Sequence, residues 1–172
     1  MENPPALWPL PNVWLGVTAE NQEQADKRIP ILLKTPAALR FVSIEPMLEE
    51  IYLSEYLNEQ CGVCQSRYVG ASYTKDDEYF CLECDVTHKY DLLAKLDWVI
   101  VGGETGAGAR PLRYQWVKDI QAQCETANVP FFFKKWGKLG QIYKTLIDGY
   151  IGGVECRAMP EAMGLGLWRF AR

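Results

Sequence analysis

Four cysteines in two closely spaced pairs are the residues of this sequence best suited to chemistry. Cys61 and Cys64 form one C-x2-C pair, and Cys81 and Cys84 form the second after an interval of sixteen residues. Each pair turns two sulfurs toward one ion, and four thiolates are the usual ligands of tetrahedral Zn²⁺. Because four sulfurs fill the coordination shell, we expect a structural zinc site. Mononuclear iron, which takes the same S4 ligation, and four cysteines that bind no metal are the alternatives.

A second group of polar residues follows the expected β-strands. The apolar run 98–101 leads into a loop that contains Gly102, Gly103, Gly106 and Gly108. In open α/β sheets and (β/α) barrels, ligand sites lie at the carboxyl ends of the strands, and glycine lets the backbone approach a ligand. The loop contains neither the dinucleotide-binding fingerprint nor a phosphate-binding P-loop. It therefore predicts a site of another kind, with a βα turn that binds nothing as the alternative.

Similar polar residues follow the other expected strands, which would bring them all to the same end of a sheet. Carboxylates and a lysine in such a place do acid–base chemistry or bind a charged ligand. Each residue alone is also a common helix cap, surface charge or ion-pair partner. We predict no particular catalytic residue. The predicted cofactor-binding residues are Thr18, Glu20, Asn21, Glu45, Gly102, Gly103, Glu104, Thr105 and Lys134. Lys135 and Trp136 are expected at the same end of the sheet and are not assigned to this set.

The spacing of apolar residues predicts the elements that hold these groups. Apolar runs predict strands at 12–18, 40–44, 97–101 and 129–133, and helical periodicity predicts helices at 22–33, 85–95 and 114–127. Pro30 falls inside the first helix and should kink it or start a second one. A weak hairpin pattern covers 141–157, with its turn at Asp148 and Gly149. The alternation of strands and helices predicts a parallel sheet with right-handed crossovers.

These elements give an α/β fold, a partial (β/α) barrel of about four parallel strands with an inserted four-cysteine, zinc-ribbon-like knuckle. We divide the chain into an extended lead-in (1–11), a half-barrel domain (12–58 and 85–160), the insertion (59–84) and a C-terminal tail (161–172). Cys124, on an apolar helix face, is expected in the core.

The net charge of −4 does not indicate a surface that attracts nucleic acid, and no apolar run is long enough to cross a membrane. Without a signal peptide, the expected location is cytoplasmic.

Four long motifs occur along the chain: Asn-Val-Trp-Leu-Gly-Val-Thr-Ala-Glu-Asn-Gln (12–22), Arg-Phe-Val-Ser-Ile-Glu-Pro-Met-Leu (40–48), Leu-Asp-Trp-Val-Ile-Val-Gly-Gly-Glu-Thr-Gly (96–106) and Val-Pro-Phe-Phe-Phe-Lys-Lys-Trp-Gly (129–137). Shorter ones lie at 28–33, 35–37, 109–111 and 149–160. In this order they resemble the C-terminal half of the phage gp-thirty-seven/gp-sixty-eight family. That family is a domain of unknown function found in phages and bacteria, and it is similar to radical S-adenosylmethionine proteins.

The resemblance implies a barrel-type sheet with Glu45 and Glu104 facing a ligand. The N-terminal half of that family carries a three-cysteine motif of the kind that holds a [4Fe–4S] cluster open to S-adenosylmethionine. This sequence starts after that motif, and its own cysteines have a different spacing.

The resemblance therefore implies a half that contributes cofactor- or substrate-binding loops and is inactive alone. It would use S-adenosylmethionine and [4Fe–4S] only when a separate N-terminal half or another protein chain completes it. A non-enzymatic zinc-ribbon interaction protein and a gene remnant without activity are the alternatives.

Overall fold

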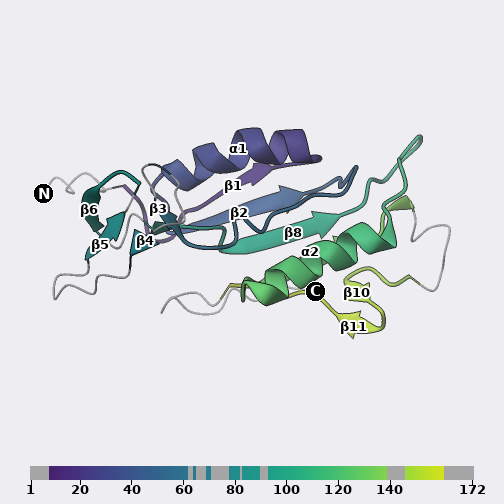
Figure 1. Cartoon of the computed structure of the whole chain (residues 1–172). Coiled ribbons are helices and arrows are strands. Elements are labelled where there is room, and N and C mark those ends of the chain that lie inside the picture. The colour runs from purple at the N-terminus through teal and green to yellow at the C-terminus, as the bar shows by residue number, and fades with distance from the viewer. Residues whose placement is uncertain are drawn as a thin grey trace, which may run out of the picture.

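A four-stranded parallel sheet forms the centre of the protein (Figure 1). The computed structural model describes residues 8–61, 64, 69–70, 78–81, 83–89, 93–138 and 146–160. The strands lie in the order β1 (Trp14–Thr18), β2 (Leu39–Ile44), β8 (Trp98–Gly102) and β9 (Phe131–Lys135). Every neighbouring pair is parallel, so all four carboxyl ends meet at one end of the sheet. The predicted α/β fold with four parallel strands is confirmed.

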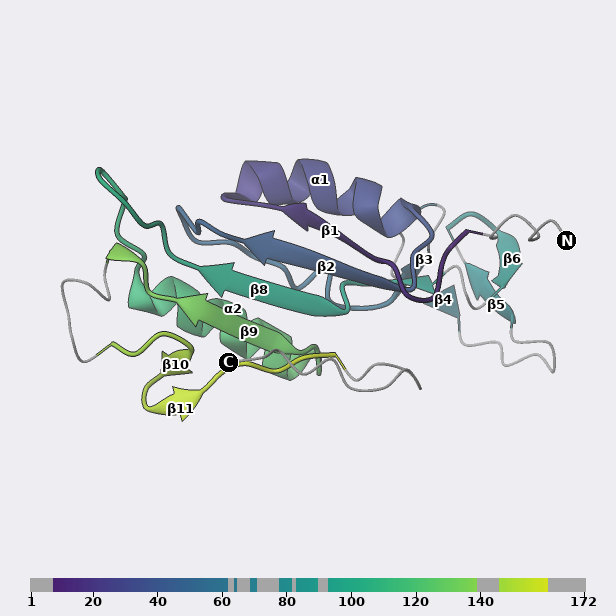
Figure 2. The ribbon, with the colours of Figure 1, turned by 180° about the vertical axis from the view of Figure 1, so that it is seen from behind.

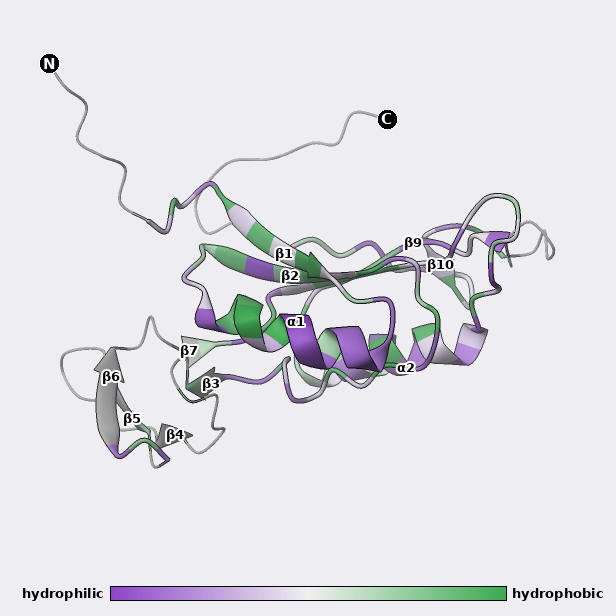
Figure 3. Ribbon diagram, turned by 90° about the horizontal axis from the view of Figure 1, so that it is seen from above, coloured by the Kyte–Doolittle hydropathy of each residue, from purple (hydrophilic) through white to green (hydrophobic). Residues whose placement is uncertain are grey.

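Helices α1 (Gln22–Lys34) and α2 (Tyr114–Thr126) cover the same face of this sheet (Figures 2 and 3). Each helix is amphipathic, because its apolar residues recur at the spacing of one helical face. The main core lies between the helices and the sheet, and it includes Cys124, as predicted. Its fully or nearly fully buried side chains include Ile29 and Leu33 of α1, Val117 and Ile120 of α2, and Val42, Ile44, Val99, Val101 and Phe133 of the sheet.

Local sequence sets the ends of both helices. The side-chain oxygen of Asn21 accepts a hydrogen bond from the Gln24 N–H at 2.9 Å, which makes Asn21 the N-cap of α1. Pro30 lies inside α1 and does not start a second helix, because the buried apolar face continues on both sides of it. Beyond α2, Asn128 has a φ of 53°, the left-handed conformation that asparagine tolerates just after a helix.

The opposite face of the sheet, which we call the inner face, is covered by neither helix (Figure 3). It carries a cluster of aromatic rings around Trp98. The Trp98 ring centroid lies 6.0 Å from those of Trp14 and Phe132 and 5.8 Å from that of Phe41. The Phe41 ring also lies against Gly16, where it leaves no room for a Cβ atom. The sheet thus has a complete core on one side and an aromatic surface on the other.

An antiparallel ribbon lies beyond the amino ends of the parallel strands (Figures 1 and 3). In this ribbon β3 (Gln60–Cys61) pairs with β7 (Leu93–Ala94), and β5 (Glu78–Cys81) lies between β4 (Val69–Gly70) and β6 (Val86–Lys89). The helix predicted at 85–95 is therefore wrong, since that segment contains β6 and β7. Strand β6 is held by its ladder to β5, which is a different segment of the chain. The spacing of apolar residues within one segment does not predict pairing with another segment.

The C-terminal hairpin differs from the predicted one. It consists of β10 (Tyr150–Ile151) and β11 (Val154–Glu155). The turn of this hairpin is made by Gly152 and Gly153, with φ of 59° and 82°. Glycine accepts the positive φ values that this tight turn requires. A turn is also present at 148–149, as predicted, where the Tyr150 N–H donates to the Ile147 C=O at 3.0 Å, but it precedes the described hairpin. Much of the predicted first arm (141–145), the start of the lead-in (1–7) and the tail (161–172) lie outside the described residues.

Strand β9 also ends two residues later than predicted, at Lys135. Lys135 pairs with Gly102 of β8 beyond an irregularity in the ladder, and this cross-strand pairing extends β9 into a charged segment. Lys134 is therefore part of the strand rather than of the loop after it.

Candidate functional site

The segments at the carboxyl ends of the four parallel strands are joined by backbone hydrogen bonds, and we call this end of the sheet the rim. Each segment is bonded to the one that follows the neighbouring strand. The bonds run from the Leu48 N–H to the Glu20 C=O (2.9 Å), from the Met47 N–H to the Gly102 C=O (3.0 Å), from the Gly103 N–H to the Lys135 C=O (2.9 Å) and from the Lys138 N–H to the Glu104 C=O (2.9 Å). The main chain thus holds the shape of the rim.

Glu45, directly after β2, lies between two lysines of β9. Lys134 Nζ donates to Glu45 Oε2 at 2.9 Å, and Lys135 Nζ lies 2.9 Å from Oε1. The Glu45 side chain is 18% exposed, whereas that of Lys134 is 53% exposed. Burial alone would raise the pKa of Glu45, but hydrogen bonds from Lys135 and Lys134 outweigh burial and lower this pKa. The ionised carboxylate between two ammonium groups leaves one surplus positive charge.

Packing within the chain accounts for Gly102 and Gly103, both of which are buried. A Cβ on Gly102 would lie 3.2 Å from the Glu45 Cδ, and a Cβ on Gly103 would overlap the carbonyl group of Trp136. Gly137, with a φ of 60°, packs its Cα against the backbone of the same glycine-rich loop. The close approach of main chain to main chain therefore requires Gly103 and Gly137 whether or not a ligand is bound, whereas Gly102 packs against the Glu45 side chain.

Glu104 pairs with Arg110 across the glycine-rich loop. Arg110 Nε donates to Glu104 Oε2 and Arg110 Nη2 donates to Oε1, both at 2.9 Å, and the Arg110 N–H donates to Oε2 at 2.8 Å. The side-chain and backbone hydrogen bonds from Arg110 lower the pKa of Glu104 to about 2. Thr105, next in the loop, is exposed, and within the described part of the chain its side chain makes no hydrogen bond.

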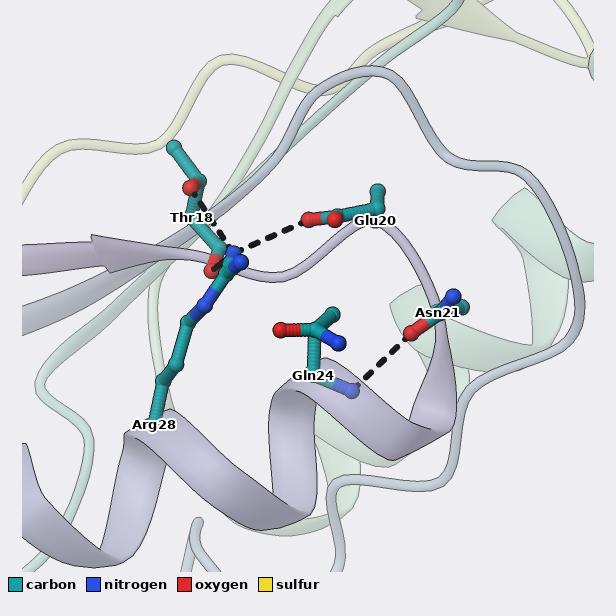
Figure 4. A network of polar contacts seen from close by, with 5 residues as sticks. All are labelled: Thr18, Glu20, Asn21, Gln24 and Arg28. Atoms are coloured by element: carbon teal, nitrogen blue, oxygen red, sulfur yellow. Dashed lines mark hydrogen bonds and ion pairs between the residues drawn. The ribbon is translucent and has the colours of Figure 1, made fainter.

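Arg28 of α1 reaches back to the end of β1 (Figure 4). Its Nη1 donates to the Thr18 C=O at 2.7 Å, to Thr18 Oγ1 at 3.2 Å and to Glu20 Oε2 at 3.0 Å. The Asn21 side chain is turned toward Gln24 instead, where it caps α1. Asn21 is therefore engaged by the helix, while Thr18 and Glu20 share one guanidinium group.

The predicted residues thus form three separate groups of side chains on one rim rather than a single cluster. Two charged partners, Arg28 and Arg110, were not among the residues expected at the strand ends. Lys135 was expected there beside Lys134 but was not assigned to the cofactor-binding set. Arg110 follows the glycine-rich loop closely, but nothing in the local sequence of α1 marked Arg28 as a partner of the β1 end.

The four cysteines of the ribbon come together, as predicted. Their sulfurs all lie within 4.8 Å of one another. The separations are 3.7 Å for Cys61 and Cys84, 3.5 Å for Cys64 and Cys81, and 3.2 Å for Cys64 and Cys84. A tetrahedral zinc site with Zn–S bonds of about 2.3 Å has sulfurs about 3.8 Å apart. Cys61 and Cys81 are buried and Cys64 is exposed, so the group is compatible with a metal site at the protein surface.

The two remaining cysteines lie away from both places. Cys124 is buried in α2, and Cys156 is buried beside β9. Burial raises the pKa of the Cys124 thiol to about 12, so this thiol stays protonated and unreactive at neutral pH. The sequence contains six cysteines, and none of them lies at the rim.

The fold and its two sites define an α/β protein with a parallel sheet, a charged rim and a group of four cysteines that can hold a metal. A family model described as "Protein of unknown function (DUF5131)" matches residues 1–161, and the chain belongs to this family. Neither the curated proteins nor the solved structures contain a match to the chain. No helix in the described ranges has the length and apolar character needed to cross a membrane.

Proposed function

We propose that this chain is the second half of a radical S-adenosylmethionine-like (β/α) barrel. In this role it binds part of a cofactor or substrate at the rim, and it acts only together with a half that carries a three-cysteine cluster motif. The arrangement of the sheet carries the proposal. Its four strands are parallel, adjacent in chain order and covered by helices on one face only, as are consecutive strands of a (β/α) barrel.

The distribution of side chains over the inner face supports this role. In a (β/α) barrel, the face without helices is the interior, and ligands bind at the carboxyl ends of the strands. Trp14 and Trp98, the first residues of their strands, belong to the aromatic cluster, whereas Glu45 and Lys134 lie at the opposite end. An apolar floor below a charged rim suits a ligand with an apolar part and a charged part.

The Glu45 group fits the amino-acid end of S-adenosylmethionine, which carries a carboxylate and an ammonium group. The exposed Lys134 ammonium matches the carboxylate, and the Glu45 carboxylate matches the ammonium. Bound S-adenosylmethionine supplies the radical chemistry in such proteins. The part of this chain would be to hold the charged end of the ligand in one orientation.

The cysteines of this chain do not fit a [4Fe–4S] cluster at that site. The ribbon cysteines lie beyond the amino ends of the strands, at the opposite end of the sheet from the rim (Figures 1 and 2). Cys124 and Cys156 are buried elsewhere. A cluster near the ligand must therefore be held by the partner half, and we assign no step of its chemistry to this chain.

We also propose that Cys61, Cys64, Cys81 and Cys84 hold one structural Zn²⁺. The spacing of their sulfurs supports this, and four thiolates leave no open coordination position for catalysis. The strands β3 and β7, which join the ribbon to the sheet, contain two residues each, so bound metal would supply folding energy that this short ladder lacks.

Metal analysis of purified protein tests the zinc site. We expect about one zinc per chain in the wild type and in Cys124→Ala, a matched control that removes a thiol of the core, and little zinc in Cys61→Ser. Iron as the bound metal would contradict the assignment to zinc. A wild-type protein that takes up neither metal would refute the site.

The barrel proposal is tested with this chain and the separately expressed N-terminal half of a family member that carries the three-cysteine motif. We expect the two halves to form a complex that binds S-adenosylmethionine in equilibrium dialysis. Lys134→Gln removes a charged hydrogen-bond donor and should weaken binding about tenfold. Lys118→Gln is the matched control, because Lys118 lies on α2 and bonds to Gln121. Far-UV circular dichroism checks that both variants are folded.

Two results would contradict this function. One is the failure of the halves to associate, or an associated pair that does not bind S-adenosylmethionine. The other is a [4Fe–4S] absorption spectrum after iron reconstitution of this chain alone carrying Cys61→Ser, because that change removes one of the four ribbon thiolates and no set of cysteines at the rim could hold the cluster.

A further inference from the structure

The four ribbon cysteines differ in their accessibility to solvent. Cys61 and Cys81 are fully buried, with 0% of their surface exposed, whereas Cys64 is exposed and Cys84 is partly exposed. The two accessible cysteines come from different C-x2-C pairs, one from each. An oxidant in solution therefore meets one cysteine of each pair, and the other cysteine of each pair is shielded.

The buried and the accessible cysteines also lie in different kinds of local structure. Cys61 is the last residue of β3 and Cys81 is the last residue of β5, so the ladders of the ribbon hold both in place. Cys64 and Cys84 lie in turns, three residues further along the chain in each case. Turns move more readily than the strands they connect. The accessible cysteines are therefore the ones whose sulfurs can shift without breaking a ladder.

The sulfurs of Cys64 and Cys84 lie close enough to be joined by a small movement. They are 3.2 Å apart, which is less than the 3.5 Å between Cys64 and Cys81 or the 3.7 Å between Cys61 and Cys84. The sulfurs of a disulfide are about 2.0 Å apart, so a movement of about 1–2 Å within the two turns is enough. A bond between them would link the two C-x2-C pairs directly.

The charges beside Cys84 favour a neutral oxidant. Glu83 and Asp85 flank this cysteine in the sequence, and both are exposed. Two carboxylates repel an anionic reagent and leave a neutral one unaffected. Hydrogen peroxide is small and neutral, and it converts thiolates to sulfenic acids. A peroxide is therefore the class of oxidant that suits this pair.

We propose that Cys64 and Cys84 form a disulfide when peroxide oxidises the ribbon, and that this bond releases the metal. The proposal rests on the zinc site proposed above and is independent of the barrel function. In the first step the Cys64 sulfur attacks a peroxide oxygen, the O–O bond breaks, and hydroxide leaves a sulfenic acid behind. In the second step the Cys84 sulfur attacks the Cys64 sulfur, the S–S bond forms, and the S–O bond breaks with loss of a second hydroxide.

The two steps together transfer two electrons from the cysteines to the peroxide. Each thiolate loses one electron, the peroxide gains both, and the two hydroxides take up two protons to become water. The zinc ion keeps its oxidation state but loses two of its four ligands, and Cys61 and Cys81 alone do not make the four-coordinate shell of a structural site. Reduction of the disulfide restores all four thiolates, so the release is reversible.

Treatment of zinc-loaded protein with hydrogen peroxide tests this pair. The dye pyridylazoresorcinol measures the free zinc, and mass spectrometry of peptides locates the disulfide after the remaining thiols are alkylated. We expect about one zinc released for each bond between Cys64 and Cys84, and dithiothreitol with added zinc should reverse both changes. Cys124→Ala is the matched control, because Cys124 is buried in α2 and its loss should leave the release unchanged.

Cys64→His separates zinc binding from disulfide formation. Three cysteines and one histidine also hold structural zinc, but histidine cannot form the bond to Cys84. This variant should bind zinc and release it about tenfold more slowly than the wild type under peroxide. If the variant binds no zinc, the peptide map of the wild type decides the question without it.

Three results would overturn the proposal: zinc that stays bound under peroxide, zinc released with a disulfide between other cysteines, and a zinc-loaded Cys64→His that releases zinc as fast as the wild type. Metal analysis before peroxide is added separates these results from a failure of the zinc site. A wild type that takes up no zinc would overturn the zinc site and the disulfide together. All of these results leave the barrel function to its own test.

Discussion

Replacing Gly103 with alanine tests whether packing within the chain accounts for this rim glycine. The added Cβ would overlap the Trp136 carbonyl oxygen and lie 2.7 Å from its carbonyl carbon and 3.1 Å from the Gly137 nitrogen. These are backbone atoms, so a change of rotamer does not relieve the overlap. The loop must move away from β9, which stretches the 2.9 Å hydrogen bond from the Gly103 N–H to the Lys135 C=O. Overpacking costs about 1–3 kcal/mol and a lost hydrogen bond about 1 kcal/mol, so we expect a loss of about 2–4 kcal/mol.

Urea unfolding followed by far-UV circular dichroism measures this loss. With a denaturant slope of about 2 kcal/mol/M, the midpoint should fall by about 1–2 M. Gly108→Asn is the matched control in the same loop, because Gly108 has a φ of 78° and nothing within 4 Å of its Cβ position, and asparagine tolerates that conformation. Its midpoint should stay close to that of the wild type. A Gly103→Ala protein as stable as the wild type would refute the packing argument and leave ligand approach as the reason for this glycine.

Three further predictions concern a helix cap, an ion pair and the ribbon. Asn21→Ala should lower the free energy of unfolding by about 1 kcal/mol and the melting temperature by about 2–4 °C, whereas Asn21→Asp, an equally good cap, should not; a loss in both variants would argue against capping. The lowered pKa of Glu104 means that its pair with Arg110 stabilises the fold above the ordinary glutamate pKa and that this stability is lost as pH falls toward about 2. The difference in urea midpoint between the wild type and Arg110→Gln should therefore shrink between pH 5 and pH 3, and a constant difference would contradict the pair. Chelation of the metal proposed at the four cysteines should speed amide hydrogen exchange in β3 and β7 but not in β8, and equal exchange with and without chelator would argue against a structural metal.

The parallel sheet was predictable because each of its strands carries a signal in its own residues. The run 98–101 is apolar and ends in glycines, and the runs near 40–44 and 129–133 are apolar and aromatic. The helices between them show the spacing of one buried face. Segment 85–95 has no comparable strand signal, and its pattern favoured a helix: β6 contains four residues, and its ladder to β5 depends on a segment elsewhere in the chain. A pairing of that kind was not visible in the local pattern.

The partners of the charged rim residues were not predictable for the same reason. Glu45 and Lys134 are separated by 89 positions, and only the completed sheet places β9 so that its last residues face the end of β2. The ribbon cysteines are the opposite case. Their convergence could be predicted because each C-x2-C pair is a local turn and four sulfurs need only one ion.

One surplus positive charge distinguishes the Glu45 group from the other groups at the rim, whose contacts are explained by packing within the chain. Glu104 is satisfied by Arg110, Glu20 by Arg28, and the glycines by neighbouring groups of the chain, so none of these needs a ligand. Of these groups, the one around Glu45 alone holds a second ammonium for a single carboxylate, and its more exposed lysine is free to bond elsewhere without leaving Glu45 unpaired. The surrounding loops are bonded through their backbones, so little order has to be imposed when an anion binds, and preorganised groups bind at lower cost. If the rim binds a ligand as proposed, the second ammonium of the Glu45 group therefore favours a ligand with an anionic group.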